Sequence, residues 1–152
     1  MSLFDNKQET NLKACIEMVE AVLHDMGIEP NQARIASETG PAWGLTRGSA
    51  EVFVFLSAAD EGDNYIQVIA PVMRPPQPAA NLYPHLLELN ANDLTGAAFG
   101  LRNGDVVLTA DRSTSGLDRV EVEEMIRRIG EYADHFDDAL TAQFGGTRAC
   151  DL

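Results

Sequence analysis

The chain has 152 residues, of which 45% are hydrophobic and 23% charged, and its formal net charge is −13 at pH 7. This length suffices for one domain with a core that needs no disulfide or metal. The negative charge disfavours binding to nucleic acid and to anionic membrane surfaces, because both are negatively charged themselves. Two interpretations of the charge remain, a well-solvated surface and attraction to a basic partner.

The sequence predicts neither export, nor membrane insertion, nor a disulfide framework. The opening MSLFDNKQET lacks the basic and apolar regions of a signal peptide, and no apolar run approaches the ~18 residues of a membrane span. Cys15 falls on the apolar face of a predicted helix, and we expect Cys150, near the end of the chain, to be a free thiol. These features favour a cytoplasmic protein.

The first predicted element is a helix over residues 7–26, with Asp5 or Thr10 as its candidate cap. Its apolar positions recur at helical spacing and comprise Leu12, Cys15, Ile16, Val19, Val22, Leu23 and Met26. Gly27 and Pro30 are typical of a helix end. A weak strand is predicted over residues 33–38, before the Gly40-Pro41 break.

A continuous apolar strand is predicted over residues 49–57, which read SAEVFVFLS. Alternation along a strand places Val52, Val54 and Leu56 on one face and the rings of Phe53 and Phe55 on the other. Because neither face is polar, we expect both to be covered, and the aromatic face has no obvious partner within the chain.

The next predicted strand spans residues 65–73 and carries Tyr65, Gln67 and Ile69 on one face, with aliphatic side chains on the other. Residues 74–78, RPPQP, predict a stiff linker without ladder hydrogen bonds. A second helix is predicted over residues 82–91, with Asn81 as its cap.

A β-hairpin is predicted around Asn103-Gly104, the residue pair that suits a type I′ turn. This turn would pair residue 102 with 105, 101 with 106, 100 with 107 and 99 with 108. The side chains of Phe99, Leu101, Val106 and Leu108 would then share one face.

The last predicted helix begins after Asp118, its candidate N-cap, with Glu121 positioned to complete a capping box. Its apolar stripe comprises Val122, Met125, Ile126, Ile129, Ala133, Phe136, Leu140 and Phe144. Gly145-Gly146 ends the helix, and residues 147–152 are predicted to form a frayed C-terminal tail.

The element order α-β-β-β-α-β-β-α predicts a single α+β domain over residues 1–146. Its core would be a twisted antiparallel sheet of five strands flanked by three helices. If the helices cover one face, the aromatic face needs another cover, for which the candidates are a second subunit, a bound peptide or the protein's own helices.

The sequence contains none of the motifs that mark common catalytic or nucleotide-binding sites, including GxSxG, GxGxxG, the P-loop and HExxH. His85 and Glu88 lie on one helix face, but a pair without further ligands favours a surface contact over a metal site. The cluster of Glu131, Asp134, His135, Asp137 and Asp138 is interpreted as a solvated acidic face. We therefore predict no enzyme activity, no catalytic residues, no metal and no cofactor.

The stretch LLELNANDLTGAAFGLRNGDVVLTADRSTSGLD, followed by an amphipathic helix, resembles the YbjN family of bacterial proteins. That family is grouped with the type III secretion chaperones of the Tir-chaperone (CesT) type. The resemblance implies a secretion-chaperone-like fold, commonly homodimeric, that binds a partly unfolded peptide through apolar surface. It carries no catalytic residue over.

The leading hypothesis is therefore a non-enzymatic, chaperone-like module that forms a homodimer and holds an apolar segment of a client protein. Its candidate peptide or dimer interface comprises Phe53, Phe55, Tyr65, Gln67 and Ile69. The alternative is a small-molecule-binding sensory or regulatory domain, with Trp43, Tyr65 and Tyr83 lining an apolar pocket. An enclosed cavity would favour the alternative, and an open groove the leading hypothesis.

Overall fold

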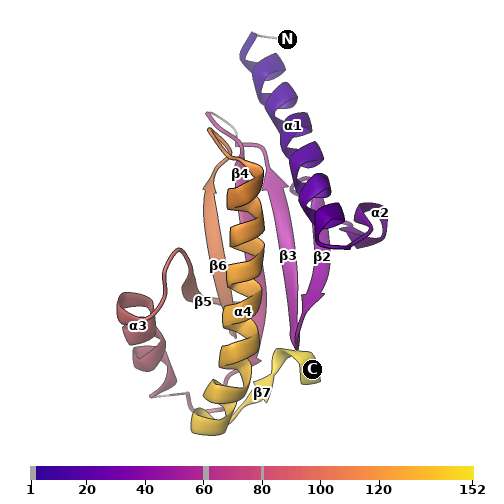
Figure 1. Cartoon of the computed structure of the whole chain (residues 1–152). Helices are drawn as coiled ribbons and strands as arrows, with labels where there is room; N and C mark the ends of the chain where they lie inside the picture. Colours follow the sequence, from indigo (N-terminus) through magenta and orange to yellow (C-terminus); the bar gives the residue numbers. More distant parts are fainter. Residues whose placement is uncertain (1–2, 60–61, 80) are drawn as a thin grey trace. The chain divides into compact units, whose positions relative to one another are not determined.

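The computed structural model describes residues 3–59, 62–79 and 81–152 (Figure 1). The helices are α1 (Leu3–Asp25), α2 (Pro30–Ala33), α3 (Leu82–Asn92) and α4 (Arg119–Phe144), with a final 3₁₀ turn η1 (Ala149–Asp151). The strands are β1 (Arg34–Ile35), β2 (Ala42–Arg47), β3 (Ala50–Ser57), β4 (Tyr65–Arg74), β5 (Ala98–Arg102), β6 (Asp105–Ser113) and β7 (Thr147–Arg148).

The strands form one seven-stranded sheet in the order β1-β2-β3-β4-β6-β5, with β7 paired to β4. The predicted α+β class is confirmed, but the sheet has two strands more than expected. Residues 33–38 form the end of α2 and the two-residue β1, rather than one strand. The strand β2 was not predicted, although it pairs directly with β1 through Arg34–Trp43 and Ile35–Ala42.

The chain divides into two compact units, each assembled from three segments. The first unit comprises Met1–Leu45, Phe53–Val68 and Asp111–Ile126, and the second comprises Thr46–Val52, Ile69–Ala110 and Arg127–Leu152. In the first unit, Val19, Leu23, Trp43, Leu56 and Ile126 are among the fully buried side chains. The second unit buries a separate set that includes Met73, Leu82, Leu108, Ile129 and Leu140.

The hairpin of β5 and β6 confirms the predicted register at all four residue pairs, and Ala98 also pairs with Thr109. Asn103 and Gly104 have φ angles of 52° and 86°, as a type I′ turn requires. On the predicted apolar face, Phe99, Val106 and Leu108 are buried, whereas Leu101 is 54% exposed. Phe99 packs edge-on against Phe136 of α4, with ring centroids 5.3 Å apart, so α4 covers this face of the hairpin.

The helix α4 begins with the predicted capping box. The backbone N–H of Glu121 donates to Oδ1 of Asp118 at 2.8 Å, and Oε2 of Glu121 accepts from the N–H of Asp118 at 3.3 Å. Further along, Gly130 allows a close approach to the β2–β3 hairpin, because a Cβ there would lie 2.9 Å from Cγ of Arg47 and 3.5 Å from Cγ2 of Val52. The face of β3 that carries Val52 is therefore the face that α4 covers.

The C-terminal residues 147–152 do not form the predicted frayed tail. Thr147 and Arg148 pair with Arg74 and Met73 of β4 (Figure 1). The guanidinium of Arg148 donates to Asp138 at 2.7 Å and to Asp151 at 2.9 Å. These carboxylates, Asp151 foremost, raise the pKa of Arg148 above its usual range. The strand pairing and the ion pairs together fix the end of the chain.

The first helix begins earlier than predicted, so neither candidate cap lies at its start. Asp5 and Thr10 fall inside α1, and Oγ1 of Thr10 donates to the carbonyl of Asn6 at 2.7 Å. The end of the helix matches the prediction. Gly27 has a φ of 80°, and the N–H of Ile28 donates back to the carbonyl of Leu23 at 2.9 Å.

Candidate functional site

The most distinctive surface of the first unit is the face of its strands opposite the buried aliphatic side chains. On β3, Val52, Val54 and Leu56 are fully buried, while Phe53 and Phe55 are half-buried, with ring centroids 6.5 Å apart. On β4, Ile66 and Val68 are fully buried, whereas Tyr65 is 48% exposed. The alternation predicted for β3 is confirmed, whereas that predicted for β4 holds from Tyr65 to Val68 and ends at Ile69, which is buried.

We call this surface the open face and define it by Ile35, Phe53, Phe55, Tyr65, Gln67 and Asp111. Ile35 is 39% exposed, and it belongs to this surface because both Ile35 and Phe53 lie next to Gly44 of β2. A Cβ at Gly44 would lie 3.3 Å from the ring of Phe53 and 3.7 Å from Cγ2 of Ile35. Because Gly44 has no side chain, the Phe53 ring can lie close to β2 at this position.

The polar edge of the open face is formed by Gln67 and Asp111. Nε2 of Gln67 donates to Oδ1 of Asp111 at 3.0 Å, which fixes the carboxylate of β6 beside β4. Sequence reasoning identified Gln67 but missed Asp111 and Ile35, because neither lies on one of the two strands with a clear apolar pattern. The fifth predicted residue, Ile69, belongs to the second unit and is only 3% exposed, so it offers almost no surface to a partner.

A buried polar network joins three segments of the first unit. Oδ1 of Asn11 on α1 accepts from Nδ2 of Asn64 at 2.9 Å and from Oγ1 of Thr114 at 2.7 Å. Asn64 and Thr114 are 2% and 3% exposed, so both need such partners. Burial raises the pKa of the neighbouring Cys15 thiol, which therefore stays protonated and acts as the predicted core residue.

The sequence predicts a solvated acidic face near the end of α4, but two of its carboxylates form hydrogen bonds within the protein. Asp134 accepts from the backbone N–H and from Oγ of Ser49, both at 2.7 Å. Asp137 is 3% exposed and lies 2.5 Å from the same hydroxyl. These bonds tie the β2–β3 turn to α4. Hydrogen bonds from Ser49, its N–H foremost, lower the pKa of Asp134. Among the described residues, no group of three or more His, Cys, Asp and Glu side chains could hold a metal ion.

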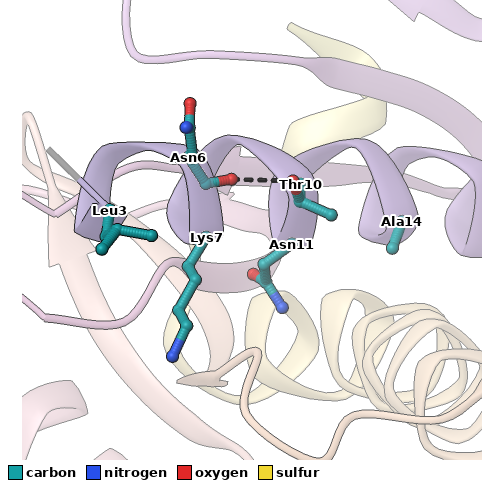
Figure 2. Close-up of a pocket in the computed structure, with 6 residues that line it drawn as sticks. All are labelled: Leu3, Asn6, Lys7, Thr10, Asn11 and Ala14. Atoms are coloured by element: carbon teal, nitrogen blue, oxygen red, sulfur yellow. Dashed lines mark hydrogen bonds between the residues drawn. The ribbon is translucent and has the colours of Figure 1, made fainter. Parts of the chain in front are cut away.

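Three aromatic side chains were expected to line a small-molecule pocket. Trp43 is fully buried beneath Arg34, whose guanidinium lies 5.0 Å from the ring centroid, and Tyr65 and Tyr83 are 48% and 37% exposed. A hollow of about 420 Å³ lies along the N-terminal half of α1. Figure 2 shows Leu3, Lys7 and Asn11 pointing to the same side of the helix along this hollow.

The second unit carries its own exposed apolar side chains on α3 and β5, which lie next to each other (Figure 1). Tyr83 and Leu87 of α3 are one helical turn apart and are 37% and 67% exposed, and Leu101 of β5 is 54% exposed. His85 on the same helix is partly exposed and packs against the ring of Phe144, with ring centroids 5.1 Å apart. In the part of the chain that the structure describes, no helix is long and apolar enough to cross a membrane.

Three solved structures show the same fold at low sequence identity. The "Structure of the HopA1-SchA Chaperone-Effector Complex" contains a chain with a TM-score of 0.59 and 13% identity, covering 86% of this chain and 97% of that one. The "Crystal Structure of the ExsC-ExsE Complex" gives 0.56 and 14%, covering 84% and 94%. The ExoT-SpcS complex from Pseudomonas aeruginosa gives 0.52 and 13%, covering 78% and 92%.

These similarities confirm the predicted secretion-chaperone-like fold, an open antiparallel sheet with helices. Comparison with the curated proteins gives no match. The model of one protein family, described as "YbjN: Putative bacterial sensory transduction regulator", matches residues 16–142. This match covers most of the chain and includes the helix–hairpin–helix stretch that carries the resemblance in the sequence. The chain belongs to the YbjN family.

Proposed function

We propose that this protein is a non-enzymatic, chaperone-like binding module that holds an apolar segment of a partner polypeptide on the open face. The observation that carries the proposal is the pair of half-exposed rings, Phe53 and Phe55, directly opposite fully buried aliphatic side chains. A soluble domain rarely exposes neighbouring aromatic side chains without a partner. Together with the exposed Ile35 and Tyr65 of the same unit, they offer apolar surface suited to an extended or helical apolar segment.

The similar solved structures support a polypeptide partner. All three are complexes of two named proteins, and one is described as a chaperone–effector complex. At 13–14% identity they establish the fold alone, so the proposed binding role rests on the partly exposed rings of this chain.

The test compares three aspartate substitutions on one strand. Phe53→Asp and Phe55→Asp should leave a folded protein, because each side chain already reaches solvent and its new charge can be hydrated. Val54→Asp should unfold the domain, because Val54 is fully buried and an unpaired carboxylate there costs several kcal/mol. Circular dichroism and sedimentation velocity measure the fold, and fluorescence anisotropy measures binding of a labelled apolar peptide.

We expect the two Phe variants to remain folded and to lose peptide binding. Folded Phe variants that bind as tightly as the wild type would place the binding surface elsewhere. Unfolding of all three variants would mean that both faces of β3 belong to the core, which would remove the basis of the proposal.

For the predicted homodimer, we propose the exposed apolar residues of α3 and β5 in the second unit as the contact surface. The backbone N–H and C=O of Phe99 on β5 are already bonded to the side chain of Asn90 on α3, at 2.7 and 3.2 Å, so the exposed side chains and not the strand edge carry this proposal. A patch of exposed apolar side chains that meets its own copy about a two-fold axis is self-complementary. Leu87→Glu should convert a dimer into a monomer in sedimentation equilibrium, while Glu88→Gln, at the neighbouring exposed position, serves as the control. A wild-type monomer at high protein concentration would refute the homodimer.

A regulatory domain that binds a small molecule is the second candidate, because the family description names sensory transduction. Its specific support here is the hollow along α1. The two candidates differ in the surface they need, since substitutions at Lys7 should affect a small ligand and leave peptide binding on the open face unchanged.

A further inference from the structure

The open face contains negative charge but no positive charge. Asp111 is exposed and accepts a hydrogen bond from Gln67, and among the described residues it forms no ion pair with a basic side chain. Among the six residues that define the open face, Asp111 is the one with a charged side chain.

The two arginines that neighbour the open face in the sequence are both turned away from it. Arg34, next to Ile35, lies over Trp43 and donates to Oε1 of Glu20 at 3.2 Å. Since Arg34 and Trp43 are paired positions on adjacent strands, the arginine projects to the buried side of β2.

Arg112, next to Asp111, is occupied in the same way. Its guanidinium donates to Oε2 of Glu121 at 2.6 Å and to the carbonyls of Ser113 and Ser115 at 2.8 and 2.6 Å. A guanidinium that donates to one carboxylate and two carbonyls cannot also form an ion pair with Asp111 without giving up these bonds. These two arginines therefore do not neutralise the negative charge of the open face, which stays available to a cationic group of another molecule.

We propose that the open face recognises a partner segment in which apolar side chains lie next to lysine or arginine. This inference rests on the proposed function and specifies the chemistry of the partner. The apolar side chains would cover the rings of Phe53 and Phe55, and the cation would approach the carboxylate of Asp111 and the ring of Tyr65. The net charge of −13 adds a long-range attraction to the same partner.

The same charges argue against a second copy of this chain on the open face. Two open faces brought together would place the Asp111 carboxylates of both copies at one dehydrated interface, on molecules that each carry a net charge of −13. This is why we assign self-association to α3 and β5 and the partner segment to the open face.

The experiment uses two labelled peptides with the same apolar residues, one flanked by lysines and the other by glutamates, and measures their binding to the full chain by fluorescence anisotropy. At about 0.1 M salt the lysine peptide should bind at least about tenfold tighter, and this advantage should shrink at about 1 M salt, where charges are screened beyond about 3 Å. Asp111→Asn should weaken the lysine peptide by about three- to tenfold and leave the glutamate peptide unchanged or slightly tighter.

Glu124→Gln is the matched control, because it removes the same charge from an exposed position of α4 away from the open face. Equal loss with Glu124→Gln and Asp111→Asn would show that only the net charge matters and would overturn the inference. Equal binding of both peptides, with both lost in Phe53→Ala, would also overturn it while leaving the proposed function intact. If neither peptide binds at either salt concentration, the proposed function fails and the inference fails with it.

Discussion

Replacing Gly130 by alanine should destabilise the protein, although alanine is the better helix former. In a helix interior this exchange alone is worth about 1 kcal/mol in favour of alanine. A Cβ at Gly130, however, would lie 2.9 Å from both Cβ and Cγ of Arg47, about 0.6 Å inside the shortest ordinary carbon–carbon contact of about 3.5 Å. Both Arg47 atoms are close to the backbone, so the strand or the helix must move. Such overpacking costs about 1–3 kcal/mol, which leaves a net loss of roughly 1 kcal/mol.

Thermal and urea denaturation of Gly130→Ala test this value, and we expect the melting temperature to fall by about 2–4 °C. The sharper comparison is made in the Arg47→Gly background, which lacks both clashing atoms. There Gly130→Ala should be neutral or stabilising by up to about 1 kcal/mol, because only the helix preference remains. A stabilisation of the same size in both backgrounds would refute the close approach between α4 and the β2–β3 hairpin.

Three further predictions concern single contacts. Asp118→Ala should lower the free energy of unfolding by about 0.5–2 kcal/mol, because it removes the acceptor for the N–H of Glu121, and an unchanged urea midpoint would contradict this. Gly104→Val should destabilise the hairpin by about 1–3 kcal/mol, since a β-branched residue resists a φ of 86°, whereas Gly104→Asn should be tolerated. The lowered pKa of Asp134 means that its contribution to stability is complete above pH 3.8 and is lost as the pH falls through its folded value. Ser49→Ala should therefore destabilise more at pH 7 than at pH 2, and equal losses would argue against the Ser49 bonds as the cause.

Local signals in the sequence predicted the elements whose conformation depends on neighbouring residues. The Asn103-Gly104 pair determines the turn by its own φ preference, and the register of the whole hairpin follows from it. The cap of α4 is similarly contained within four residues, Asp118 to Glu121. Alternation along β3 correctly separated the buried aliphatic side chains from the partly exposed rings, since period-two patterns are geometric consequences of an extended backbone.

The missed elements depend on contacts between segments distant in sequence. The strand β2 contains Gly44, and glycine disfavours a strand prediction. In the structure, the absence of a side chain at Gly44 leaves room for the ring of Phe53. The ordered end of the chain depends on pairing with β4, more than seventy residues earlier, and on Asp138. Asp111 could not be recognised as part of the candidate site, because a lone aspartate near a strand end shows its role only when Gln67 lies beside it and Arg112 is occupied elsewhere.

The hydrogen bonds of Asn11 have a consequence for synthesis of the chain on the ribosome. The side-chain amide oxygen of Asn11 accepts hydrogen bonds from donors that lie 53 and 103 residues further along the chain. Until Thr114 has emerged, the side chain of Asn64 can bond to Asn11, but the backbone carbonyl of Asn64 lacks the donors of Thr114, and burying it unpaired would cost about 1–3 kcal/mol. The first unit should therefore become stable late in translation, and a nascent chain arrested before Thr114 should remain sensitive to protease.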